Sequence, residues 1–158
     1  MPDTKTTTKS TRAARASENV WTDEERAAMQ ESARERKTVS RRSPEDERAA
    51  GELEIRAKIA EMTQAERDLA ERIHALVTNI APAFVPRTYY GMPAYAKDGK
   101  VICFFQPASK FKVRYSTFGF QPEATIDDGE MWPVAFALTE LTPAAEARIA
   151  ELVKKAAG

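Results

Sequence analysis

The chain has 158 residues, enough for one domain of ordinary size. Lys plus Arg number 24 and Asp plus Glu number 24, and this zero net charge argues against a nucleic-acid coat protein. No apolar run approaches the roughly 20 residues of a membrane span, and the N-terminus lacks the apolar core of a signal peptide, so we expect a cytoplasmic protein without a membrane partner. One cysteine and one histidine exclude an intrachain disulfide and a zinc site of several Cys and His ligands.

The N-terminal part of the chain is polar. Residues 1–17 are rich in Thr, Lys, Arg, Ser and Ala, which predicts a short, disordered cationic tail. Thr22 and Glu25 have the spacing of a capping box, which predicts a helix from there to about Lys37. The apolar face of this helix is thin, so we expect it to be docked or solvated rather than central to the core.

Two further helices are expected before the strands. Ser43 followed by Pro44 predicts a helix start, and its apolar stripe is Ile55, Ile59 and Met62. We therefore expect residues 18–62 to be a charged, two-helix extension that could dock a protein partner. A capping box at Thr63–Glu66 starts the third helix, whose apolar face is Leu69, Ile73, Leu76, Val77 and Ile80.

The middle of the chain predicts antiparallel strands. Tyr89–Ala96 leads into Lys97–Lys100, where Asp-Gly indicates a tight hairpin turn. Val101–Phe105 has no polar member and is expected to be a central strand. Lys110–Tyr115 alternates basic and apolar residues, which predicts a strand with one basic face, and Val134–Leu138 predicts the last strand.

A final helix completes the predicted architecture. Thr142 followed by Pro143 predicts its start, and Lys154 and Lys155 suit its C-terminal end. The fold class we expect is α+β, a two-layer domain in which helices flank an antiparallel meander. The core domain is expected over residues 63–158, because almost all aromatic residues lie there.

The single cysteine and the single histidine do not form a recognisable catalytic group. Cys103 lies inside the apolar strand, which is typical of a buried, inert thiol. His74 falls between core positions of the third helix, and no nucleophile with its base can be named. We therefore expect no enzymatic activity.

Three groups of residues could bind ligands. Four carboxylates lie close together beside Gly129 and could hold a divalent cation, or could simply be a solvated loop: Glu123, Asp127, Asp128 and Glu130. Four side chains near the strands could line a small ligand groove: Tyr90, Met92, Tyr115 and Trp132. The basic face predicted at Lys110, Lys112 and Arg114 could hold an anion, or keep a sheet surface soluble.

The sequence also resembles a known family. Tyr90–Tyr95 (YGMPAY), the Asp98–Lys100 hairpin, the apolar Val101–Phe105 strand and Lys110–Tyr115 look like the YdhG-like domain, over about residues 64–156. This bacterial domain has the SufE/YdhG-type α+β fold. Some members resemble frataxin-like iron chaperones that hold iron on acidic surface residues, so the resemblance implies weakly bound Fe(II).

Three functions are therefore open at the level of sequence. The first is a small binding or carrier protein, with iron as the cargo that the resemblance implies. The second is an interaction module that uses the N-terminal helices. The third is an enzyme acting on a small ligand in the aromatic groove.

Overall fold

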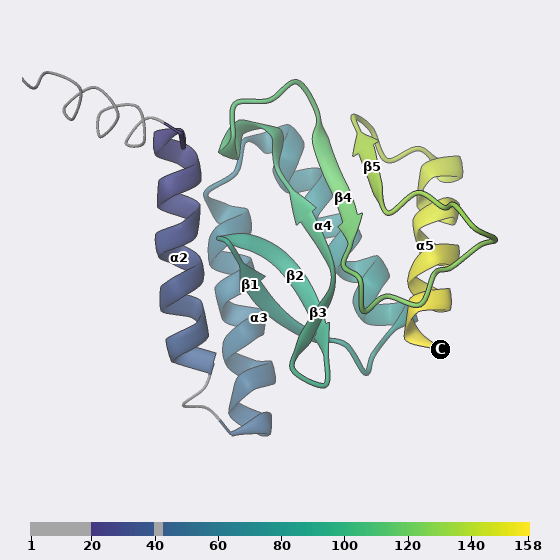
Figure 1. Ribbon diagram of the computed structural model, residues 1–158, viewed down its shortest axis with the longest axis horizontal. Helices are drawn as coiled ribbons and strands as arrows, with labels where there is room; N and C mark the ends of the chain where they lie inside the picture. Colours follow the sequence, from purple (N-terminus) through teal and green to yellow (C-terminus); the bar gives the residue numbers. More distant parts are fainter. Residues whose placement is uncertain (1–19, 40–42) are drawn as a thin grey trace, which may run out of the picture.

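The computed structural model describes residues 20–39 and 43–158, so the tail predicted for residues 1–17 lies outside the described residues. The described chain begins with three helices, α2 (Asp23–Val39), α3 (Pro44–Ala60) and α4 (Gln64–Ile80). Helix α5 (Pro143–Ala157) ends it (Figure 1). Between α4 and α5 lie a 3-10 turn, η1 (Ala108–Lys110), and five strands: β1 (Val85–Tyr89), β2 (Met92–Lys97), β3 (Lys100–Gln106), β4 (Ser116–Phe120) and β5 (Ala135–Leu138).

The five strands form one antiparallel meander in the order β1-β2-β3-β4-β5, which confirms the predicted α+β fold class. The tight hairpin between β2 and β3 is confirmed as well. Its central residues, Asp98 and Gly99, both have positive φ, at 52° and 78°. This is the conformation that Asp-Gly adopts at low cost in a type I′ turn.

Helices α3, α4 and α5 share one core with the sheet. Ile55 of α3, Ile73 of α4 and Val153 of α5 belong to the same buried cluster as Tyr95 and Phe105. The apolar stripe predicted for the second helix therefore lies in the main core. Gly51 makes this close packing possible, because a Cβ there would lie 1.8 Å from the carbonyl oxygen of Pro86 in β1.

The helix starts follow the capping signals of the sequence. Thr63 and Glu66 form a complete capping box on α4, and Ser43 and Thr142 cap α3 and α5 by accepting from the N3 backbone N–H. Each such cap stabilises its helix by about 1 kcal/mol. No helix in the described ranges is long and apolar enough to cross a membrane.

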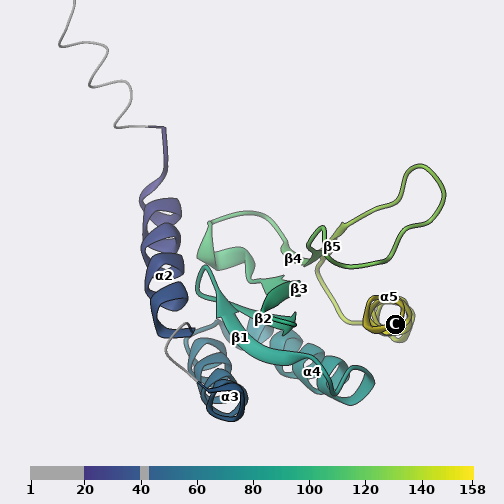
Figure 2. The ribbon, with the colours of Figure 1, turned by 60° about the horizontal axis from the view of Figure 1, so that its bottom comes forward.

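Helix α2 lies at the margin of the molecule, beside α3 and the β1–β2 hairpin (Figures 1 and 2). Within the described part of α2, Ala28 and Ser32 are the buried side chains. Val20, Trp21 and Met29 are exposed. The helix is thus docked on the domain through a narrow contact.

Two predicted strands are wrong in detail. Tyr89–Ala96 is divided by a reversal at Tyr90 and Gly91, both with positive φ, so it holds parts of two strands. Lys110–Tyr115 is a turn and loop, in which Lys112 has a φ of 53°. Ser116–Phe120 pairs with β3 instead, because this segment buries Phe118 and Phe120 in the core. Burial of these aromatic side chains outweighs the alternation of basic and apolar residues in Lys110–Tyr115.

Candidate functional site

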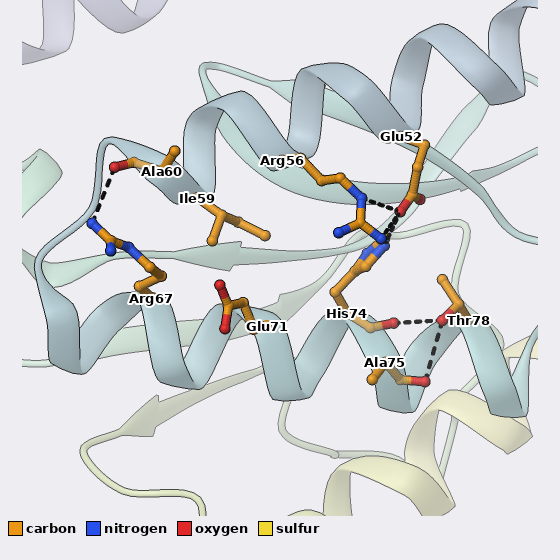
Figure 3. A pocket seen from close by; sticks show the side chains of 9 residues that line it. All are labelled: Glu52, Arg56, Ile59, Ala60, Arg67, Glu71, His74, Ala75 and Thr78. Carbon is orange, nitrogen blue, oxygen red and sulfur yellow. Dashed lines mark hydrogen bonds and ion pairs between the residues drawn. The ribbon is translucent and has the colours of Figure 1, made fainter.

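A groove lies between α3 and α4, with a volume of about 910 Å³ (Figure 3). Its position follows from the amphipathic pattern of both helices, since their apolar faces pack on the sheet and their polar flanks face each other. Nine residues line it: Glu52, Arg56, Ile59, Ala60, Arg67, Glu71, His74, Ala75 and Thr78.

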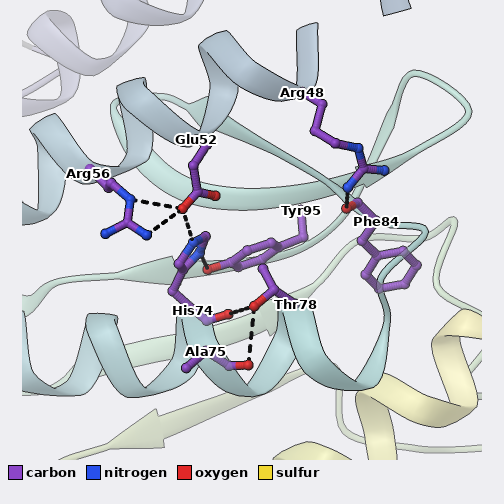
Figure 4. A network of polar contacts seen from close by, with 8 residues as sticks. All are labelled: Arg48, Glu52, Arg56, His74, Ala75, Thr78, Phe84 and Tyr95. Atoms are coloured by element: carbon purple, nitrogen blue, oxygen red, sulfur yellow. Dashed lines mark hydrogen bonds and ion pairs between the residues drawn. The ribbon is translucent and has the colours of Figure 1, made fainter. Parts of the chain in front are cut away.

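A chain of hydrogen bonds runs from the core to this groove (Figure 4). The hydroxyl of Tyr95, which is fully buried on β2, lies 2.9 Å from Nδ1 of His74. Nε2 of His74 lies 2.8 Å from Oε1 of Glu52. A carboxylate can only accept, so a neutral His74 carries its proton on Nε2 and accepts from Tyr95 at Nδ1. The chain satisfies a buried tyrosine hydroxyl and fixes the imidazole ring.

Arg56 completes the network at the surface. Its guanidinium contacts Oε1 of Glu52 through Nε and a terminal nitrogen, both at 2.9 Å. Burial on its own would raise the pKa of Glu52. The hydrogen bond from His74 and the charge that this ring carries when protonated, together with Arg56, outweigh burial and hold that pKa below its ordinary value. Glu52 is therefore an anion at neutral pH.

Two charged side chains of the groove are incompletely paired among the described residues. A terminal nitrogen of Arg67 donates to the carbonyls of Ala60 and Met62, at 3.2 and 3.3 Å, whereas its Nε is buried with no hydrogen-bond acceptor among the described residues. Glu71 has no hydrogen bond or ion pair with any described residue, and its carboxylate points toward α3 in Figure 3. Within the described part of the chain, the groove thus contains one hydrogen-bond donor without an acceptor and one carboxylate without a cationic partner.

The four residues predicted to form an aromatic groove lie apart. Tyr90 is half-buried in the β1–β2 turn and lines a second, smaller pocket, of about 340 Å³. Met92 is buried, Tyr115 is exposed just before β4, and Trp132 packs against the core from the β4–β5 loop. None of these three lines the groove or the second pocket.

The predicted metal residues all lie exposed in the long β4–β5 loop: Glu123, Asp127, Asp128 and Glu130. Nowhere in residues 20–39 and 43–158 do three or more His, Cys, Asp or Glu side chains gather as a metal site requires. The loop is attached to α5 by Lys155, whose ammonium donates to the backbone carbonyl of Asp127 at 2.7 Å.

Cys103 lies on β3 with no exposed surface, which confirms that it is buried. Burial raises the pKa of its thiol far above the ordinary value. Two of the three basic residues predicted to share a strand face instead contact α2, since Lys112 pairs with Glu24 at 2.6 Å and Lys110 lies 3.6 Å from Glu31. The guanidinium of Arg114 lies over the ring of Tyr115, at 5.3 Å from its centroid.

The sequence prediction missed most of the residues that line the groove. His74 was visible as a polar residue between core positions, but its partners Glu52 and Tyr95 come from α3 and β2, far from it in sequence. One signal was available in Glu52 and Arg56, which are spaced i and i+4 as a helical ion pair.

Comparison with protein-family models, with curated proteins and with solved structures finds no significant match to this chain. The interpretation of the groove therefore depends on its own geometry and chemistry.

Proposed function

We propose that this protein binds a small polar molecule in the groove between α3 and α4 and carries out no covalent chemistry on it. The observation that carries the proposal is the pair of unmet groups, the carboxylate of Glu71 and the buried Nε–H of Arg67. A ligand that places a cationic amine on Glu71 and an anionic oxygen on the guanidinium of Arg67 pairs with both charges. The Nε–H is buried in this conformation, so the Arg67 side chain must turn before that N–H meets the ligand. A buried donor without an acceptor costs about 1–3 kcal/mol, and this turn would recover part of that cost.

The neighbouring network supports binding rather than catalysis. Tyr95 is fully buried, and burial, followed by the nearby Cys103 and Glu52, raises its pKa well above the ordinary value, so its hydroxyl stays protonated. Both ring nitrogens of His74 are already within hydrogen-bond distance of protein partners. These groups form a fixed wall that holds Arg56 and Glu52 in place at the mouth of the groove.

Membership of the YdhG-like family is also a proposal, supported by the antiparallel meander between helices and by the hairpin at Asp98–Gly99. Iron handling is the weaker part of that proposal, because it depends on the resemblance and not on a cluster of ligands. A role as an interaction module is supported by the narrow docking of α2.

Native mass spectrometry of protein purified from its own host tests the ligand proposal. We expect a small-molecule adduct on the wild-type protein. Its occupancy should fall about tenfold in Glu71→Gln, because the carboxylate that pairs with the ligand amine becomes neutral. Asp68→Asn is the matched control, since Asp68 lies on the same helix but does not line the groove.

Two results would contradict the proposal. One is wild-type protein that carries no adduct. The other is an adduct whose occupancy is the same in Glu71→Gln and in Asp68→Asn.

A further inference from the structure

Helix α2 is attached to the β1–β2 turn by a carboxylate. Oε2 of Glu35 accepts from the backbone N–H of Tyr90 at 3.0 Å, and Oε1 accepts from the N–H of Gly91 at 2.8 Å. Two successive backbone N–H groups thus hold one carboxylate, with one donor for each of its oxygens. Hydrogen bonds to a charged acceptor of this kind are stronger than neutral ones.

The turn is shaped for this contact. Tyr90 and Gly91 both lie in the left-handed region, with φ of 51° and 74°. For a residue with a Cβ, such as Tyr90, that conformation costs roughly 1–2 kcal/mol. Successive N–H groups that converge in a turn form a concave site that binds anions. A Cβ on Gly91 would lie 1.7 Å from Oε2 of Glu31 and 2.6 Å from the ammonium of Lys110, so only glycine leaves room for these charged groups.

Two lysines extend the site beyond the turn. The ammonium groups of Lys110 and Lys58 each lie 3.6 Å from Oε2 of Glu31. This oxygen is buried and has no hydrogen-bond partner among the described residues. Glu31 therefore balances Lys110 by charge alone, without the close contact that a better-fitted anion would make, and it shares Lys58 with Oε2 of Glu61, which lies 3.7 Å from that ammonium.

The contact between α2 and the domain depends on charge. Besides Glu35 and Glu31, Glu24 pairs with Lys112 at 2.6 Å. The buried side chains in the described part of α2 are Ala28 and Ser32, which are both small, whereas Trp21 and Met29 are exposed. The Glu24–Lys112 pair is exposed at its lysine, and exposed ion pairs stabilise by about 0–1 kcal/mol and weaken with salt. With only small side chains buried, α2 is held mainly by Glu35 and Glu31, so an anion that competes for their partners would weaken its docking.

We infer that the Tyr90–Gly91 turn, with Lys110 and Lys58, is an anion-binding site that Glu35 and Glu31 of α2 fill in this structure. When α2 moves away, a phosphate or carboxylate group of a separate ligand takes the place of Glu35. This site shares no residue with the α3–α4 groove, so it stands independently of the proposed groove function.

The test is a titration of the full chain with inorganic phosphate, and separately with acetate, followed by the NMR shifts of the Tyr90 and Gly91 amides. Glu35→Gln removes the internal anion, and Glu24→Gln is the control, with the same charge change on the same helix. We expect anion binding at the two amides to be at least about tenfold tighter in Glu35→Gln than in Glu24→Gln or wild type. The two titrations distinguish a phosphate site from a carboxylate site.

A second variant keeps the test decisive. Adding Lys110→Gln to Glu35→Gln should remove the gain in affinity, because the cation that faces the anion is lost. Equal binding by Glu35→Gln and Glu24→Gln would overturn the inference. Shifts at surface lysines without any at Tyr90 and Gly91 would overturn it too. If Glu35→Gln loses its dispersed spectrum, Glu31→Gln is titrated against the same control and must show tighter binding than that control.

Discussion

Glu66 connects the start of α4 to the turn η1. Its carboxylate accepts from the backbone N–H of Ser109 at 2.8 Å, from the Ser109 hydroxyl at 2.7 Å and from the N–H of Thr63 at 3.4 Å. Burial on its own would raise the pKa of Glu66, but the hydrogen bonds from Ser109 and Thr63 outweigh it and hold the pKa below its ordinary value. One side chain thus stabilises both a helix cap and a loop.

Glu66→Gln should lower the free energy of unfolding by about 1–3 kcal/mol at neutral pH, because hydrogen bonds to a charged acceptor are lost. The pKa of Glu66 is lower in the folded than in the unfolded state, so its stabilisation is complete above the ordinary carboxyl value and is lost as the pH falls through the folded value. Urea unfolding at neutral pH and in acid measures this. The difference between variant and wild type should shrink in acid.

Glu151→Gln, an exposed change on α5, serves as the control and should have little effect at either pH. A difference between Glu66→Gln and wild type that stays constant from neutral pH to acid would contradict the role of ionised Glu66.

Cys103 should react slowly with thiol reagents in the native protein and rapidly in denaturant. Burial blocks access and raises the pKa of the thiol, so both effects reduce the reactive thiolate. Labelling rates measured with and without denaturant check this. Equal rates would show that β3 opens readily or that the thiol is accessible.

At the scale of elements, the sequence correctly predicted the features that depend on a few neighbouring residues, namely helix caps and tight turns. The caps at Thr63 and Thr142 and the turn at Asp98–Gly99 were correct, because each depends on a few neighbouring residues. The strand predicted at Lys110–Tyr115 was wrong, because strand pairing is decided by which segment fills the core. The docking of α2 was expected in general terms, but its contact with the turn at Gly91 depends on residues more than 50 positions apart, as the bond from Gly91 to Glu35 shows.

Gly51→Ala should destabilise the protein by about 1–3 kcal/mol or more, because the added Cβ would meet the Pro86 carbonyl and force α3 away from β1. In a solvated helix the same change would raise the free energy of unfolding by roughly 0.5–1 kcal/mol, so the sign of the change is the test. Thermal or urea unfolding measures this change. A more stable variant would show that α3 does not pack closely on the sheet.

A chain that starts at Ser43 should fold and melt less than about 10 °C below the full chain, since α2 buries only small side chains. Circular dichroism on heating checks this. A larger loss would mean that α2 contributes several kcal/mol, and its docking would then be too strong for the displacement inferred above.

At the scale of the whole molecule, the groove could not be predicted because its network joins α3, α4 and β2. The pairing of His74 with Glu52 and Tyr95 needs the tertiary fold, whereas the acidic loop at Asp127 and Asp128 is obvious in sequence yet does not gather into a ligand set. Proximity in sequence is thus a poor guide to proximity in space for exposed loop residues.

Anaerobic titration with Fe(II) should give equal, negligible heats for wild type and for the double variant Asp127→Asn/Asp128→Asn. An open, all-oxygen set in an exposed loop binds weakly and with little selectivity among Fe(II), Mn(II) and Mg(II). Calorimetry measures this directly. Tight binding that is lost in the double variant would establish an iron site in the β4–β5 loop.

The strand order has a consequence for how the chain folds. Every strand of the sheet pairs with its nearest neighbour in sequence, so the sheet forms without a long crossover. Low contact order of this kind is associated with rapid folding, because little loop-closure entropy is lost before pairing contacts form. The β1–β2 and β2–β3 hairpins each close through a two-residue turn, so we expect their pairings to form first and the remaining strands to add as adjoining segments of the chain.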